Sequence, residues 1–128
     1  MGNYCIDAYA WVEYLIGSDK GKKVADIVEN PDNEIFTSPV TLAEVVSVAK
    51  REGRDYNAAF SIVLNLSKLF EISGEVAMET GRLHAEIKKR IRDFGLADAF
   101  VLLAAKKLKA KVVTGDPHFK GFAEALML

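Results

Sequence analysis

Short β-prone runs alternate with helical patterns along this chain, and no other feature of the sequence restricts the fold as much. The runs predicted as strands span residues 4–6, 34–37, 69–73, 111–114 and 124–128. Between the first four of them, apolar residues recur at helical spacing. Parallel strands need long, right-handed crossovers, which are usually helical. The sequence therefore predicts an α/β fold, a three-layer sandwich in which helices flank a central parallel sheet.

Helix boundaries are marked by residues that end a strand or cap a helix. The apolar spacing becomes helical at Ala8, directly after Asp7, and Gly17 ends that helix. The run Thr41 to Glu44 has the pattern of a capping box, and it is expected to open a helix that continues to about Arg51. Further helices are expected at 20–29, after the cap Asp55, at 75–92, and after Gly95.

The totals indicate one domain over residues 1–128. Half of the 128 residues are hydrophobic, which is enough for a sizeable core. The net charge of −1 argues against nucleic-acid binding through bulk positive charge, although it leaves room for local basic patches. Cys5 is the only cysteine, so no internal disulfide is expected. Because no signal peptide and no apolar run of ~20 residues is found, we expect a cytoplasmic protein without membrane contact.

One carboxylate, Asp98, lies in a stretch that otherwise has the composition of a buried helix, GLADAFVLLAAKKL. Leu96, Phe100 and Leu103 are expected on one apolar face of this helix. The simplest explanation of Asp98 is its place in the first turn, where the helix dipole favours a carboxylate by about 0.3–1 kcal/mol. That explanation suffices for one acid. A functional interpretation depends on whether other acids reach the same place.

Three more acids are predicted at the carboxyl edge of the sheet, where ligand crevices form in open α/β folds. Asp7 and Asp116 directly follow predicted strands, whereas Glu44 and Asp98 lie in the first turns of predicted helices. Each has a structural explanation, as a helix cap, a capping-box residue or a dipole partner. Carboxylates about 5 Å apart repel by roughly 3 kcal/mol per pair, whereas a cap contributes about 1 kcal/mol. If the four acids converge, capping alone cannot explain them.

A divalent cation can explain such a cluster. Carboxylate-rich oxygen ligation suits Mg²⁺ or Mn²⁺, and a phosphodiester is the natural substrate because the cation binds phosphate oxygens and activates water. Zinc is not expected, since the chain has one cysteine and two widely separated histidines. No serine or cysteine lies in a recognisable nucleophile motif. His118, two residues beyond Asp116, could lie near the site, but the favoured expectation is an ordinary surface histidine.

Four motifs in this order, IDAYAW, TLAEV, LADAFVLLAA and VVTGDPHF, resemble the PIN domain family, particularly stand-alone ribonucleases of the VapC toxin type. The resemblance covers the chain from Tyr4 to its C-terminus. It implies a parallel sheet of order 3-2-1-4-5 and an endoribonuclease that depends on Mg²⁺ or Mn²⁺. The residues that it assigns to catalysis and to the metal are Asp7, Glu44, Asp98 and Asp116, with Thr114 as a hydroxyl that hydrogen-bonds to the cluster.

The chain departs from the family pattern at Tyr9, where Ser or Thr often stands two residues after the first acid. A small hydroxyl beside the metal is therefore missing, while the four acids are intact. The resemblance also implies partners: an RNA substrate, a second copy of the chain in a homodimer, and a small antitoxin protein that blocks the crevice.

Two other classes of function stay open at this point. A catalytically inactive module that binds nucleic acid or protein would use its acids as caps and its apolar helix from Phe60 to Leu66 as a partner surface. A phospho-receiver domain shares the α/β layout and an acidic Mg²⁺ site. That fold, however, typically has paired acids after the first strand, and here Asp7 stands alone.

Basic side chains are expected to hold the phosphates of a substrate at the rim of the acidic site. The candidates are Lys88, Lys89, Arg90, Arg92, Lys106, Lys107, Lys109 and Lys111. Tyr9, Trp11 and Phe100 could stack on bases, although core packing is the expected role of Trp11 and Phe100.

Overall fold

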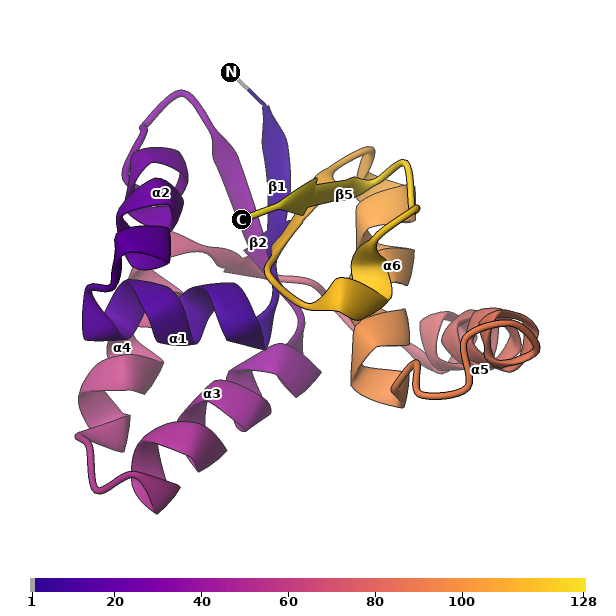
Figure 1. Ribbon diagram of the computed structural model, residues 1–128, viewed down its shortest axis with the longest axis horizontal. Helices are drawn as coiled ribbons and strands as arrows, with labels where there is room; N and C mark the ends of the chain where they lie inside the picture. Colours follow the sequence, from indigo (N-terminus) through magenta and orange to yellow (C-terminus); the bar gives the residue numbers. More distant parts are fainter. Residues whose placement is uncertain (1) are drawn as a thin grey trace.

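The computed structural model describes residues 2–128, and these form one five-stranded parallel sheet with six α-helices around it. The strand order is β3-β2-β1-β4-β5, and every neighbouring pair is parallel. The predicted α/β class and the order 3-2-1-4-5 are both confirmed (Figure 1). The strands are β1 (Asn3–Ile6), β2 (Glu34–Thr37), β3 (Lys68–Leu69), β4 (Lys111–Thr114) and β5 (Ala125–Met127).

Helices cover both faces of the sheet, which gives the expected three layers. The first four helices lie on one face, and the last two lie on the other (Figure 1). A short 3₁₀ turn, η1 (Pro117–Phe119), follows β4. The helices are α1 (Ala8–Ile16), α2 (Asp19–Val28), α3 (Pro39–Arg51), α4 (Tyr56–Leu66), α5 (Gly74–Lys88) and α6 (Leu96–Leu108).

The two central strands supply both cores through alternate side chains. Ile6 and Val113 pack under α1 to α4, whereas Cys5 and Val112 pack under α6. Successive side chains of a strand point to opposite faces, so a strand buried on both sides is apolar throughout. β1 and β4 are therefore fixed in the middle of the molecule. Their carboxyl ends, and the residues that follow them, lie side by side at one edge of the sheet.

Three predicted boundaries are wrong. β3 ends at Leu69, so residues 70–73 are not a strand. α5 ends at Lys88 rather than at 92. α3 begins at Pro39, with Ser38 as its N-cap and Pro39 in the first turn, where its fixed φ suits a helix. Thr41 is consequently a buried residue inside the helix, and Glu44 lies in the second turn rather than in a capping box.

The basic residues expected at the rim divide into two groups. Lys111 pairs in register with Tyr4 near the amino end of β1, and α6 runs away from its first-turn acid Asp98 toward Lys106 and the lysines that follow it. The four lysines 106, 107, 109 and 111 therefore lie toward the opposite edge from the acids, and their proposed role at the rim is wrong. Residues 88–92 lie in the connection that leads into the first turn of α6, so this group stays a candidate.

Apolar residues of α4 are divided between the core and the surface. Ala59 and Val63 are buried, but Phe60 is 44% exposed and Tyr56 and Leu64 lie open on the same side of the helix. Leu96, expected on a buried face of α6, is also half exposed. Within residues 2–128, no helix is both long and apolar enough to cross a membrane.

The start of α3 can be tested with a pair of substitutions. The Ser38 hydroxyl accepts a hydrogen bond from the backbone N–H of Val40 at 3.2 Å, whereas the buried Thr41 hydroxyl has no hydrogen-bond partner. Ser38→Ala is expected to lower the free energy of unfolding by about 1 kcal/mol. Thr41→Val is expected to leave it unchanged or to raise it, because an unsatisfied buried hydroxyl is removed. Urea denaturation measures both, and the reverse ranking would restore Thr41 as the cap.

Candidate functional site

Asp7 occupies the junction between β1 and α1, at the centre of the carboxyl edge. Its backbone N–H extends the pairing of β1 to the carbonyl of Val113 at 3.2 Å, and its Oδ1 caps α1 by accepting from the N–H of Ala10 at 2.8 Å. Only 5% of Asp7 is exposed. Burial raises the pKa of the Asp7 carboxyl to about 7. Asp7 is thus a helix cap, as the sequence predicts, but it is also a carboxylate that the apo protein holds at high cost in solvation.

Asp98 and Asp116 reach the same edge from the other side of β1. Asp98 lies in the first turn of α6, and its Oδ2 accepts from the N–H of Gly95 at 3.1 Å. Asp116 follows β4 and caps η1, accepting from the N–H of His118 at 2.9 Å. Burial raises the pKa of the Asp98 carboxyl, and the negative charge of Asp116 raises it further.

Glu44 approaches from α3, in its second turn. The residue is exposed, so it lies at the rim of the cluster rather than on its floor. The surrounding protein nevertheless raises the pKa of the Glu44 carboxyl, and the charge of Asp98 adds to the shift.

Asp98 lies close enough to each of the other three predicted acids for their charges to interact. The charges of Asp98 and Asp116 add to the effect of burial and raise the pKa of Asp7. The charge of Asp116 also raises the pKa of Asp98, and the charge of Asp98 raises the pKa of Glu44. A carboxylate oxygen of Asp98 and one of Asp116 lie within 4.8 Å of each other. Capping sets the direction of three of these side chains. It does not account for the repulsion between them, because a cap contributes only about 1 kcal/mol.

Thr114, the hydroxyl residue of the set, connects the two acids that follow β1 and β4. Its Oγ1 accepts from the N–H of Asp116 at 2.9 Å, and its hydroxyl donates to Asp7, which lowers the pKa of that carboxyl against the larger effect of burial. Thr114 is fully buried. It thus fixes the turn that places Asp116 and stabilises the charged form of Asp7.

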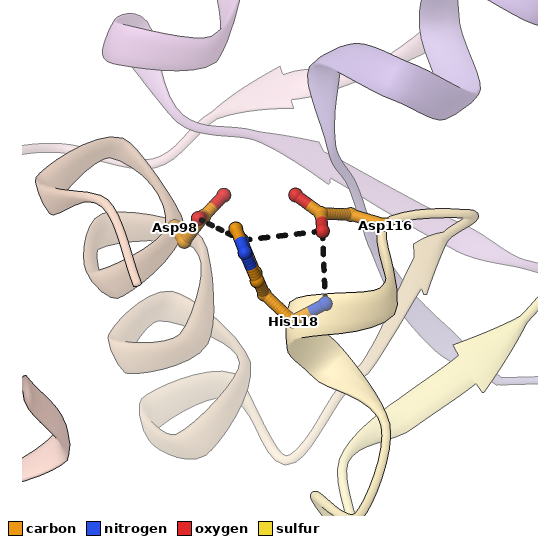
Figure 2. Close-up of side chains that lie close together, drawn as sticks. All are labelled: Asp98, Asp116 and His118. Atoms are coloured by element: carbon orange, nitrogen blue, oxygen red, sulfur yellow. Dashed lines mark hydrogen bonds and ion pairs between the residues drawn. The ribbon is translucent and has the colours of Figure 1, made fainter. Parts of the chain in front are cut away.

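His118 lies at the site, which the sequence allowed only as the less favoured alternative. Its Nδ1 lies 3.3 Å from Oδ1 of Asp116 and 3.8 Å from Oδ2 of Asp98, so the expectation of an ordinary surface histidine is wrong. Figure 2 shows the imidazole between the two carboxylates. A signal was present in the sequence, because Asp116 and Pro117 mark the start of a helical turn. In such a turn the residue after the proline, here His118, lies close to the capping side chain of Asp116.

Tyr9, where the family often has Ser or Thr, covers the turn before Asp116. Its ring lies against Gly115 so closely that a Cβ at this position would overlap it. The Tyr9 hydroxyl accepts from Nζ of Lys20 on α2 at 2.9 Å. The ring is 38% exposed. The chain therefore has an aromatic wall and a cation beside the acidic edge, in place of a small hydroxyl.

The site fits a divalent cation with oxygen ligands. Each of the three capping aspartates uses one carboxylate oxygen for a backbone N–H, which leaves the other available. Within residues 2–128, no lysine or arginine forms an ion pair with any of the four acids. A group of carboxylates without cationic side chains matches the donor set that Mg²⁺ and Mn²⁺ prefer.

Together, these features define an α/β protein with a parallel 3-2-1-4-5 sheet and a cluster of acids beside its central strands. The family model of the PIN domain matches residues 4–125. This chain belongs to the PIN domain family. Among curated proteins, none matches the sequence.

Solved structures of VapC-type toxins share this fold over nearly the whole chain. A toxin-antitoxin complex from Klebsiella pneumoniae has a chain with a TM-score of 0.74 and 22% identity, covering 97% of this chain and 96% of its own. VapC20 of Mycobacterium tuberculosis, a toxin that cleaves the sarcin-ricin loop, has a TM-score of 0.73 and 16% identity, and the match covers 94% of this chain and 97% of that chain. VapBC2 from Rickettsia felis, bound to promoter DNA, has a TM-score of 0.72 and 18% identity, and the match covers 98% of this chain and 97% of that chain.

The raised pKa of Asp7 predicts how Asp7→Asn changes the stability of the metal-free protein. Well below pH 3.8, Asp7 is protonated in both the folded and the unfolded chain, so the substitution should have little effect. Between this value and the folded pKa of about 7, the unfolded chain ionises Asp7 while the native chain keeps it protonated, so the native protein loses stability relative to the variant, and the difference levels off above pH 7. The variant should then be more stable by up to about 4 kcal/mol, at about 1.4 kcal/mol per pKa unit.

Urea denaturation in the presence of a chelator, repeated from pH 4 to pH 8, measures this difference. Asp26→Asn, an exposed acid on α2, is the matched control and should show no such trend. A variant Asp7→Asn that is less stable than the native chain at pH 8 would show that the carboxylate stabilises the fold.

The contact between Tyr9 and Gly115 predicts a strong coupling. Gly115→Ala is expected to destabilise the protein by about 1–3 kcal/mol through overpacking. Tyr9→Ala in the same chain should recover most of this loss, because the added methyl group then has room. A double-mutant cycle measured by thermal unfolding quantifies the coupling, and additive effects would contradict it.

Proposed function

We propose that this protein is an endoribonuclease that hydrolyses RNA phosphodiester bonds with Mg²⁺ or Mn²⁺, and that it is the toxin of a toxin-antitoxin pair. The observation that carries the proposal is the buried, uncompensated charge of Asp7 beside Asp98 and Asp116. Such a cluster is unfavourable in the apo protein and becomes favourable when a cation binds. Family membership and the resemblance to VapC-type toxins support the reaction class.

The roles of the residues follow from their places. Asp7, Asp98 and Asp116 hold the cation, and Thr114 orients two of them. A bound Mg²⁺ or Mn²⁺ supplies charge neutralisation, polarisation of the phosphate and an activated water. Glu44 is exposed at the rim and has a raised pKa, so it is suited to accept a proton from the attacking water.

RNA contacts must come from around the acidic edge, because the net charge of the chain is −1. Arg90 and Arg92 lie in the connection before α6, and Lys20 lies beside Tyr9. These are the cations that we propose to hold phosphates on either side of the cleavage site.

Two protein partners complete the proposal. An antitoxin that covers the crevice is supported by the structural neighbours, of which the Klebsiella pneumoniae example is a toxin-antitoxin complex. A homodimer is supported by the exposed apolar side of α4, where Tyr56, Phe60 and Leu64 lie at helical spacing and are 40%, 44% and 37% exposed.

Asp98→Asn is expected to lower RNA cleavage by at least about a hundredfold, because a metal-bound carboxylate contributes several kcal/mol to the stabilisation of charge. The assay uses the full chain, a panel of RNA oligonucleotides, DNA oligonucleotides of the same sequence, and either Mg²⁺ or Mn²⁺. A chelator should abolish cleavage of RNA by the native protein.

Asp26→Asn serves again as the control and should cleave at the native rate. Circular dichroism and thermal unfolding show that Asp98→Asn is folded; its stability without metal should equal or exceed that of the native chain, since one repelling charge is removed. Cleavage that survives the chelator, or that is unchanged in Asp98→Asn, would overturn the proposed metal-dependent mechanism. No cleavage of RNA by the native protein with either metal would favour the catalytically inactive binding module.

A further inference from the structure

We propose that His118 is a ligand of the cation, and that its ring nitrogen gives the site a preference for Mn²⁺ over Mg²⁺. The inference deepens the proposed function, on whose metal site it rests. It adds a nitrogen donor to a set that the sequence predicts to consist of oxygen only.

The distances around the imidazole suit a shared ion. Nδ1 of His118 lies 3.3 Å from Oδ1 of Asp116 and 3.8 Å from Oδ2 of Asp98, and one donor atom from each residue falls within 4.8 Å of the other two. Neighbouring ligands of an octahedral cation with bonds of about 2.1 Å are roughly 3 Å apart. The three donors are therefore close enough together to share one ion.

The position of His118 is fixed by the local fold. Pro117 sets the first residue of η1, the N–H of His118 donates to the Asp116 carboxylate, and the next side chain, Phe119, is fully buried between Phe94 and Phe122. The imidazole lies between the carboxylates in Figure 2, and each carboxylate keeps an oxygen turned away from it. The backbone that carries the imidazole is thus in place before a cation arrives.

The chemistry of the donor set decides the metal preference. Mg²⁺ requires oxygen ligands and exchanges them for nitrogen reluctantly, whereas imidazole is a common ligand of first-row transition metals. Two aspartates and one imidazole therefore favour Mn²⁺ over Mg²⁺ more than four carboxylates alone. The competing explanation is that His118 acts only as a counter-ion of Asp98 and Asp116 when no metal is bound.

Electron spin echo measurements on the untagged full chain with Mn²⁺ separate these explanations, because a coordinated imidazole couples its ¹⁴N nucleus to the manganese spin. The native protein should show this coupling. His118→Gln should lose it, and His84→Gln should keep it. His84 is the only other histidine of the chain, and it bonds to the carbonyl of Phe94 at 3.1 Å rather than to the acids.

Calorimetric titrations with Mn²⁺ and with Mg²⁺ supply an independent measurement. In His118→Gln, the affinity for Mn²⁺ should fall by at least about tenfold, as losses of ligand-supporting groups do. The affinity for Mg²⁺ should change less than about twofold, since an oxygen-only set remains. Thermal unfolding of both glutamine variants checks that they are folded.

The outcomes separate this inference from the proposed function. The inference fails if the native protein shows no nitrogen coupling. It also fails if His118→Gln lowers the affinities for Mn²⁺ and Mg²⁺ equally, or raises the affinity for Mn²⁺. In each of these cases His118 is a counter-ion, even when RNA is cleaved. If the coupling and the Mn²⁺ preference are found but RNA is not cleaved, the ligand assignment holds and the proposed reaction fails.

Discussion

The structure depends on one unfavourable placement, the carboxylate of Asp7 buried at the end of the central strand β1. Asp7 directly follows β1, which pairs with β2 on one side and β4 on the other, and only 5% of the residue is exposed. The capping N–H of Ala10 and the hydroxyl of Thr114, both neutral groups, offset only part of the cost of burying its charge. The described residues therefore do not balance a charge on Asp7, which is the observation that favours the proposed cation.

Stability and function oppose each other at this edge. Removal of charges from the cluster should stabilise the apo chain, so the acids are not explained by the folding of the protein. The two apolar cores provide the stability that the repelling charges at the edge take away. Trp11 is fully buried on one side of the sheet, and Phe94 and Phe119 are fully buried on the other. These side chains anchor α1 and η1 next to the residues that carry the acids. Rigid packing below the edge is what keeps like charges close together.

Much of the fold could be predicted because the local patterns of strands and helix caps agreed with a parallel α/β sheet. The β-prone runs that end at Asp7 and near Asp116 predicted the alternation of strands and helices. They also predicted that both acids cap helices at the carboxyl edge of the sheet. The errors have physical causes. A capping-box pattern at Thr41 competes with Ser38-Pro39, and proline at the first helical position prevails. Lys106 to Lys111 were misplaced because their distance from the acids depends on strand register and helix direction, which composition does not reveal. A place at the site was the less favoured expectation for His118 because its neighbours are set by a single turn whose geometry brings it between two acids.

Capping and the proposed metal binding need not be rival explanations of the acids. A cap uses one carboxylate oxygen and fixes the torsions of the side chain, as in Asp7, Asp98 and Asp116. Free carboxylates would have to lose side-chain entropy when they bind an ion, whereas capped ones have already lost it during folding. Under the proposed function, the caps of these three aspartates would therefore also preorganise them as ligands.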